Sequence, residues 1–135
     1  MSRPVIVTGR SRPHELLLLG LSVLTGLAYL LGSPPPGSVV ALMPHWQIYL
    51  WAFGLLLSGV MGLYGCLWRH DAGLALAVEG AAMLIGAGAL LIPAISAAAI
   101  GGARALFAAG TSAAWMAANL WRAWQIRGDL KELTP

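Results

Sequence analysis

The stretch from Trp46 to Trp68 contains no Asp, Glu, Lys or Arg side chain. A helix of about 20 apolar residues crosses the roughly 30 Å of bilayer hydrocarbon, and it satisfies its backbone hydrogen bonds within one segment. The composition agrees, because 59% of the residues are hydrophobic and 10% are charged, whereas about 25% of residues are charged in soluble domains. The sequence therefore predicts an integral membrane protein in contact with the lipid bilayer.

Three further apolar stretches predict an all-α bundle of four transmembrane helices arranged as two hairpins. Pro34-Pro35-Pro36 ends the first stretch, because proline lacks an amide donor and clashes with the preceding turn, and we expect Pro93 to stop or kink the third. The predicted helices cover residues 15–31, 45–68, 72–92 and 104–124, with connections at 32–44, 69–71 and 94–103. The remaining residues form a basic N-terminal tail at 1–14 and a charged C-terminal tail at 125–135.

Basic residues are unevenly divided between the two sides of this scheme. One side holds only Arg104, and the other holds the orientation charges Arg3, Arg10, Arg12, Arg69, Arg122, Arg127 and Lys131. Basic residues concentrate in cytoplasmic loops of membrane proteins. The pattern predicts a multi-pass protein of a bacterial cytoplasmic membrane with both termini in the cytoplasm.

Small residues recur every four positions in the second predicted helix, at Gly54, Ser58, Gly62 and Cys66. Such a face lets membrane helices approach closely. The sequence leaves open whether this helix-association face packs within one chain or joins chains into a homo-oligomer. Cys66 is the single cysteine of the chain, so it forms no internal disulfide and is read as a small packing residue.

Glu79 is the one acid placed well inside a predicted span, about two turns from its cytoplasmic end. Intramembrane acids usually pair with a partner or titrate for function. Two interpretations follow: Glu79 pairs with Arg69 or His70 near the membrane surface, or it lines a pore or senses protons.

Residue patterns for catalysis or metal binding are missing from the sequence. The three histidines, His14, His45 and His70, form no pair with metal-ligand spacing on one helix face. No serine nucleophile motif, phosphate-binding glycine loop or carboxylate pair is present. We therefore expect a non-enzyme without a cofactor, and the scattered basic residues form no stripe that would bind nucleic acid.

The whole chain resembles the small, holin-like four-span membrane proteins of actinobacterial phages and prophages. The similarity consists of the short basic N-terminus, the run Arg12-Pro13-His14-Glu15-Leu16, the turn Pro34-Pro35-Pro36-Gly37, the small-residue helices and the charged tail at 122–132. The resemblance implies lesions or pores in the host membrane that lead to cell lysis. Two alternatives remain open: an accessory membrane protein that binds a partner, and a small ion or proton-coupled transporter using Glu79.

Reporter fusions test the predicted topology. A reporter placed after Pro135 or near Asp71 should act as cytoplasmic, and one inserted near Gly37 should act as external, because the basic residues stay inside. Alkaline phosphatase and fluorescent protein activities in whole cells give the reading. A phosphatase active at Asp71 would contradict the two-hairpin arrangement.

Overall fold

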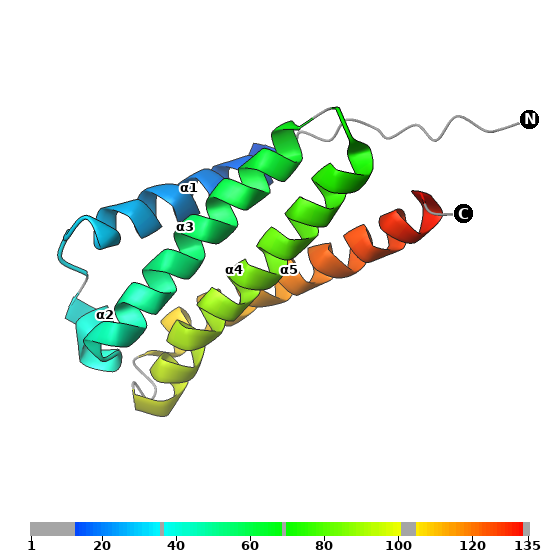
Figure 1. Cartoon of the computed structure of the whole chain (residues 1–135). Coiled ribbons are helices and arrows are strands. Elements are labelled where there is room, and N and C mark those ends of the chain that lie inside the picture. The colour runs from blue at the N-terminus through cyan, green and yellow to red at the C-terminus, as the bar shows by residue number, and fades with distance from the viewer. Residues whose placement is uncertain (1–12, 36, 69, 101–104, 134–135) are drawn as a thin grey trace, which may run out of the picture.

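The computed structural model describes residues 13–35, 37–68, 70–100 and 105–133, and the described part is helical. Its helices are α1 (Pro13–Leu30), α2 (Gly37–Leu42), α3 (His45–Leu67), α4 (Ala72–Ile100) and α5 (Leu106–Leu133). The four long helices alternate in direction (Figure 1). As a result, the start of α1, the end of α3, the start of α4 and the end of α5 lie at the same end of the molecule. We call it the charged end, because all the Asp, Glu, Lys and Arg side chains that the structure describes belong to this half of the helices.

Three of the described helices, α1, α3 and α4, are long and apolar enough to cross a membrane. The chain is therefore a helical, multi-pass membrane protein. The fourth long helix, α5, has a similar length but is less apolar, because Thr111, Ser112 and Asn119 interrupt its alanine-rich sequence and charged residues follow from Arg122.

Pro93 does not end the third predicted helix, so the bounds 72–92 were wrong. Helix α4 passes through Pro93 and continues to Ile100, across most of the residues predicted as a connection. Proline removes one helical hydrogen bond, but membrane helices tolerate this loss where neighbouring helices pack around it. Ala94 and Ala97 beyond the proline are buried, and their packing holds the helix together.

Two segments predicted as irregular also contain helix. The connection at 32–44 includes the short helix α2, and α5 continues to Leu133 where the sequence predicted a tail from residue 125. In this extension Ile126 is only 1% exposed and packs against Leu19 of α1 and Met83 of α4, with Leu130 partly buried beside them. The spacing of Ile126 and Leu130 places both on one helical face. The predicted N-terminal tail lies outside the described residues except for Pro13 and His14.

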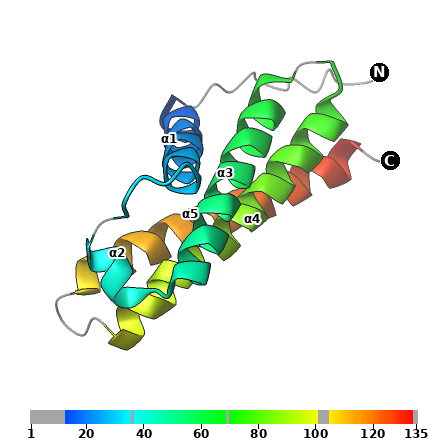
Figure 2. The ribbon, with the colours of Figure 1, turned by 60° about the vertical axis from the view of Figure 1, so that its left-hand side comes forward.

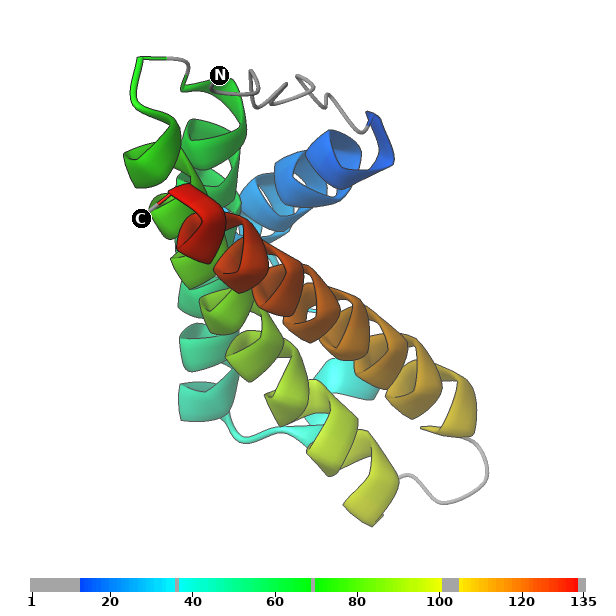
Figure 3. The same cartoon turned by 90° about the vertical axis from the view of Figure 1, so that its right-hand side faces the viewer.

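The long helices pack in chain order, α1 on α3, α3 on α4 and α4 on α5. Glycines make the contacts close: a Cβ atom on Gly59 would lie 2.8 Å from the carbonyl oxygen of Leu19, and one on Gly65 would lie 2.8 Å from the carbonyl oxygen of Ala75. Helix α1 crosses α3 at an angle, as Figures 2 and 3 show, and its backbone is not in close contact with that of α5. The space between α1 and α5 is therefore lined by side chains and is not closed by a backbone contact.

Gly26→Ala should lower the unfolding temperature, because a Cβ atom at Gly26 would lie 2.5 Å from the carbonyl oxygen of Ala52 and 2.6 Å from the amide nitrogen of Leu56. Overpacking of this kind costs about 1–3 kcal/mol. Gly20→Ala in the same helix is the matched control, since a Cβ atom there meets nothing within 4 Å. Thermal unfolding in detergent micelles, followed by circular dichroism, compares the two variants. Equal unfolding temperatures would show that α1 does not approach α3 this closely.

Candidate functional site

Three charged side chains from three helices meet at the charged end. The Nη2 and Nε atoms of Arg122 on α5 lie 2.5 Å and 2.8 Å from Oε1 of Glu79 on α4. The same Nε atom lies 3.2 Å from Oε1 of Glu15, near the start of α1. Arg122 therefore ties α5 to both α4 and α1, although the backbones of α1 and α5 are not in close contact.

Burial explains why Glu79 needs this partner. The residue is 5% exposed and lies in a helix apolar enough to cross a membrane. On its α3 side, a Cβ atom on Gly65 would lie 2.8 Å from the amide nitrogen of Glu79, so the backbone of α3 covers it. A buried carboxylate is costly unless it is paired and hydrogen-bonded. The guanidinium of Arg122 supplies both the charge and the hydrogen bond.

Arg122 was not the expected partner. The sequence suggested that Glu79 pairs with Arg69 or His70. Arg69 lies outside the described residues, and the ring of His70 packs edge-on against that of Trp68. The orientation charge Arg122 is the residue that reaches Glu79, because α4 and α5 run antiparallel and bring these positions to the same level.

The two carboxylates share Arg122 unequally. The single N–H of Nε donates its hydrogen bond to Glu79, so Glu15 receives an ionic contact and, within the described part of the chain, no hydrogen bond. The side chain of Glu15 is 17% exposed, and that of Glu79 is 7% exposed. Glu79 is thus the firmly held acid, and Glu15 is the loosely held one.

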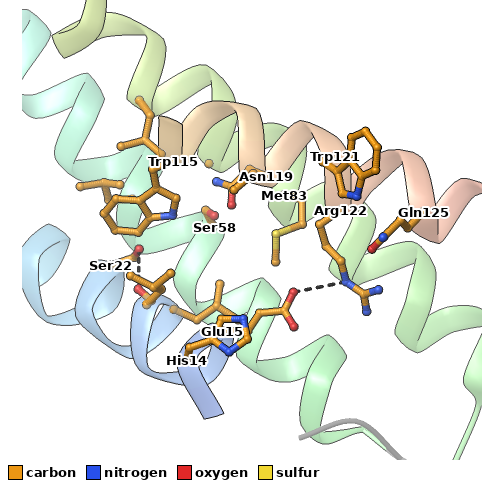
Figure 4. A pocket seen from close by; sticks show the side chains of 16 residues that line it. His14, Glu15, Ser22, Ser58, Met83, Trp115, Asn119, Trp121, Arg122 and Gln125 are labelled. Carbon is orange, nitrogen blue, oxygen red and sulfur yellow. Dashed lines mark hydrogen bonds and ion pairs between the residues drawn. The ribbon is translucent and has the colours of Figure 1, made fainter. Parts of the chain in front are cut away.

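Glu15 and Arg122 form the charged end of a groove between α1 and α5, with a volume of about 290 Å³. Figure 4 shows the polar side chains at this end and Trp115 farther along the groove. The floor comes from α3 and α4. The lining residues are His14, Glu15, Leu18, Leu19 and Ser22 of α1, Leu55 and Ser58 of α3, Met83, Gly86 and Leu90 of α4, and Trp115, Ala118, Asn119, Trp121, Arg122 and Gln125 of α5.

Polar groups also reach the middle of the groove. The hydroxyl of Ser58 donates to the carbonyl oxygen of Ala82 at 2.8 Å, and that of Ser22 donates to the carbonyl oxygen of Leu18 at 2.9 Å. The amide of Asn119 makes no hydrogen bond to any described residue. Its nitrogen lies where it would be 2.8 Å from a Cβ atom on Gly86. Because glycine has no side chain, Gly86 leaves space for the Asn119 amide.

The small-residue face of the second predicted helix contacts other parts of the same chain. A Cβ atom on Gly54 would lie 2.8 Å from Cβ of Ala89 on α4, and one on Gly62 would lie 2.5 Å from Cδ2 of Leu19 on α1. The hydroxyl of Ser58 donates its hydrogen bond to the carbonyl oxygen of Ala82 on α4. Cys66 has a free, half-buried thiol that packs beside the cluster containing Leu19. The face therefore has partners within one chain.

The remaining predicted site residues lie apart from the groove. Arg127 and Lys131 are exposed on the last turns of α5, and His45 is exposed at the start of α3. Arg3, Arg10, Arg12, Arg69 and Arg104 fall outside the described residues. Of the three histidines only His14 reaches the groove. Sequence reasoning missed Glu15 as a site residue because its position in the first helical turn was read as a favourable helix start.

Comparisons with protein-family models, with curated protein sequences and with solved structures found no match. In the described parts of the chain, no group of three or more His, Cys, Asp or Glu side chains is arranged to hold a metal ion. The chemistry of the groove itself is therefore the basis for a functional proposal.

Arg122→Met should destabilise the protein by about 3 kcal/mol, because it leaves the Glu79 carboxylate buried without its guanidinium. Glu15→Gln should cost less than about 1 kcal/mol, as expected for a partly exposed ionic contact. The double variant Glu79→Leu/Arg122→Met should recover part of the loss, since a well-packed apolar pair often replaces a buried ion pair. Thermal unfolding in micelles measures all three. A loss in Glu15→Gln equal to that in Arg122→Met would refute the unequal sharing of Arg122.

Proposed function

We propose that this chain is a non-enzymatic transporter of a bacterial cytoplasmic membrane that exchanges small organic cations for protons at Glu15. The observation that carries the proposal is the position of this carboxylate. Glu15 lies on the wall of the groove, while the guanidinium beside it directs its hydrogen bond to Glu79. Ionisable residues within membrane spans commonly mark substrate and ion pathways.

The proposal treats α5 as a fourth span, with both termini in the cytoplasm. Helix α5 has 28 residues, which makes it about 42 Å long at 1.5 Å per residue. It packs against α4, the most apolar helix of the chain. Its run from Ala105 to Trp121 is uncharged. The uneven distribution of basic residues supports the orientation.

Exchange at Glu15 needs only one proton and one cation. On one side of the membrane the carboxyl releases its proton to water and binds the cation; on the other it releases the cation and takes up a proton. Arg122 stays with Glu79 throughout. Among the long helices, the backbone of α1 comes close to that of α3 alone. Its charged end is joined to α5 by the Glu15–Arg122 contact and by the apolar cluster of Leu19, Met83 and Ile126, so weakening the ionic contact leaves only apolar side chains to hold it there. This freedom supplies the movement that alternating access requires.

Titratable groups surround Glu15 on each of the four long helices. His14 of α1 and Arg122 of α5 line the groove with it. Glu79 of α4 and Cys66 of α3 do not line the groove; Glu79 is paired with Arg122, and Cys66 lies within the electrostatic reach of both carboxylates. Because Arg122 and Glu79 neutralise each other, Glu15 is the group whose charge remains for a cation.

The lesion-forming role remains a second prediction. Its residue-level support was lateral association through Gly54, Ser58 and Gly62, and these residues already contact α4 and α1 within one chain. Lesion formation and self-association would therefore use another surface. The accessory role remains a third prediction, without a surface of the described structure that favours it.

The purified full chain, reconstituted in liposomes whose acidic interior contains the pH dye pyranine, tests the proposal. External tetramethylammonium or phenylpropyltrimethylammonium should raise the internal pH, because each cation that enters releases a proton. Potassium and valinomycin hold the membrane potential at zero. Glu15→Gln should abolish the pH change, since the amide carries no exchangeable charge. Asp129→Asn, which removes an exposed acid at the same end, is the control and should keep it.

Two results would overturn the proposal. The first is a pH change that Glu15→Gln leaves intact, or no change with either cation. The second is leakage of trapped carboxyfluorescein from wild-type liposomes, because an impermeant dye crosses a lesion and not a cation exchanger. Dye leakage would favour the lesion-forming role instead.

A further inference from the structure

We infer that the groove selects amphipathic cations: an ammonium group carried on an apolar, preferably aromatic, body that reaches from Glu15 to Trp115. This inference rests on the proposed function and names its substrate class. It follows from the order in which charged, polar and apolar groups occur along the groove.

The charge of the groove lies at one end only. Glu15, Arg122, His14 and Gln125 line that end, and the structure places no other charged side chain among the lining residues. Arg122 is held against Glu79. The negative charge that remains for a ligand is therefore that of the Glu15 carboxylate, which attracts a cation.

The opposite end is apolar and fixed in shape. Trp115 packs on a cluster of buried residues that includes Leu55 and Leu90, and all three line the groove. Seven residues separate Trp115 from Arg122 on α5, which corresponds to about 10 Å along the helix. A ligand whose cation binds Glu15 thus needs an apolar body of about that length to reach the indole ring.

The middle of the groove disfavours a highly polar body. The hydroxyl hydrogens of Ser22 and Ser58 are already donated to carbonyl oxygens of the protein. The Asn119 amide and the indole N–H of Trp115 are the lining groups that remain to donate a hydrogen bond there. A ligand with many polar groups would lose hydrogen bonds to water without replacing them, which is unfavourable. A hydrocarbon or aromatic chain loses none.

The open side of the groove gives such a ligand a route. The backbones of α1 and α5 are not in close contact, and the groove lies between these two helices. Amphipathic cations accumulate in the headgroup layer, where their apolar body is buried and their charge stays hydrated. From that layer an ammonium group meets Glu15 near the start of α1.

The liposome exchange assay tests this inference with a matched pair of cations, which differ only in the apolar body. Phenylpropyltrimethylammonium should reach half-maximal exchange at a concentration about tenfold or more below that of tetramethylammonium, because its phenyl ring is buried against Trp115. Trp115→Leu should reduce this preference to about threefold, since the leucine covers less of the ring.

Circular dichroism of the reconstituted Trp115→Leu variant shows whether it is folded and inserted. If both cations are exchanged equally well by the wild type, the inference is wrong and the proposed function stands. If neither is exchanged, the proposed function itself fails. Phosphatidylethanolamine carries an ammonium group on apolar chains, so the assay is run in phosphatidylcholine and repeated with phosphatidylethanolamine added. Loss of phenylpropyltrimethylammonium exchange on that addition would identify the groove as a lipid-headgroup site and overturn the inference.

Discussion

The contact between α3 and α4 at Gly65 decides where charge can lie in this protein. A side chain at Gly65 would collide with the backbone of α4 at Ala75 and Glu79, so the two helices meet backbone to backbone at the level of the acid. Lipid supplies no hydrophobic force between helices, and close packing of this kind is what holds them together. The cost is that Glu79 is sealed on its α3 side. Its carboxylate must therefore be neutralised from the direction of α5.

Arg122 meets this requirement and thereby sets the position of α5. With Arg122 against Glu79, Ile126 falls one turn farther along α5 and packs between Leu19 and Met83. The ionic pair and the apolar cluster thus fix the same register. Helix α1 joins the cluster through Leu19 but otherwise packs on α3. The groove is the consequence: it lies between α1 and α5, and the Glu15–Arg122 contact forms its charged end.

Local sequence signals were enough for the helices whose ends are marked by residues that cannot continue them. Pro44 stands directly before α3 and a polar turn follows it, and the predicted and observed bounds differ by one residue. Pro93 led to a wrong helix end. The hydrogen bond that proline removes can be predicted from the sequence, but the burial of Ala94 and Ala97 beyond it cannot. The end of α5 could have been found from Ile126 and Leu130, which continue an apolar face through a charged segment. The predicted helix ended before that face, at residue 124.

The candidate site was only partly accessible to the same reasoning. Glu79 and Arg122 were both noted, one as an intramembrane acid and one as an orientation charge. Their pairing was not predicted, because it depends on how α4 and α5 are placed against each other along their lengths. Glu15 was beyond reach, because its role depends on α1 crossing α3 steeply enough to bring its first turn beside α5. Crossing angles are set by close contacts at Gly26 and Gly59, and these are properties of the packed helices.

An arginine suits the junction of three helices in a way that a lysine would not. Its planar guanidinium presents several N–H donors in a fixed arrangement, and here two of its nitrogen atoms address one carboxylate. That commitment leaves the second carboxylate with charge attraction alone. A lysine ammonium is a compact charge with freely rotating donors, so it would divide itself between the two acids. The planar guanidinium of Arg122 therefore distinguishes the two acids: Glu79 is held in the fold by two nitrogen atoms, and Glu15 is the acid to which we assign cation exchange in our proposal.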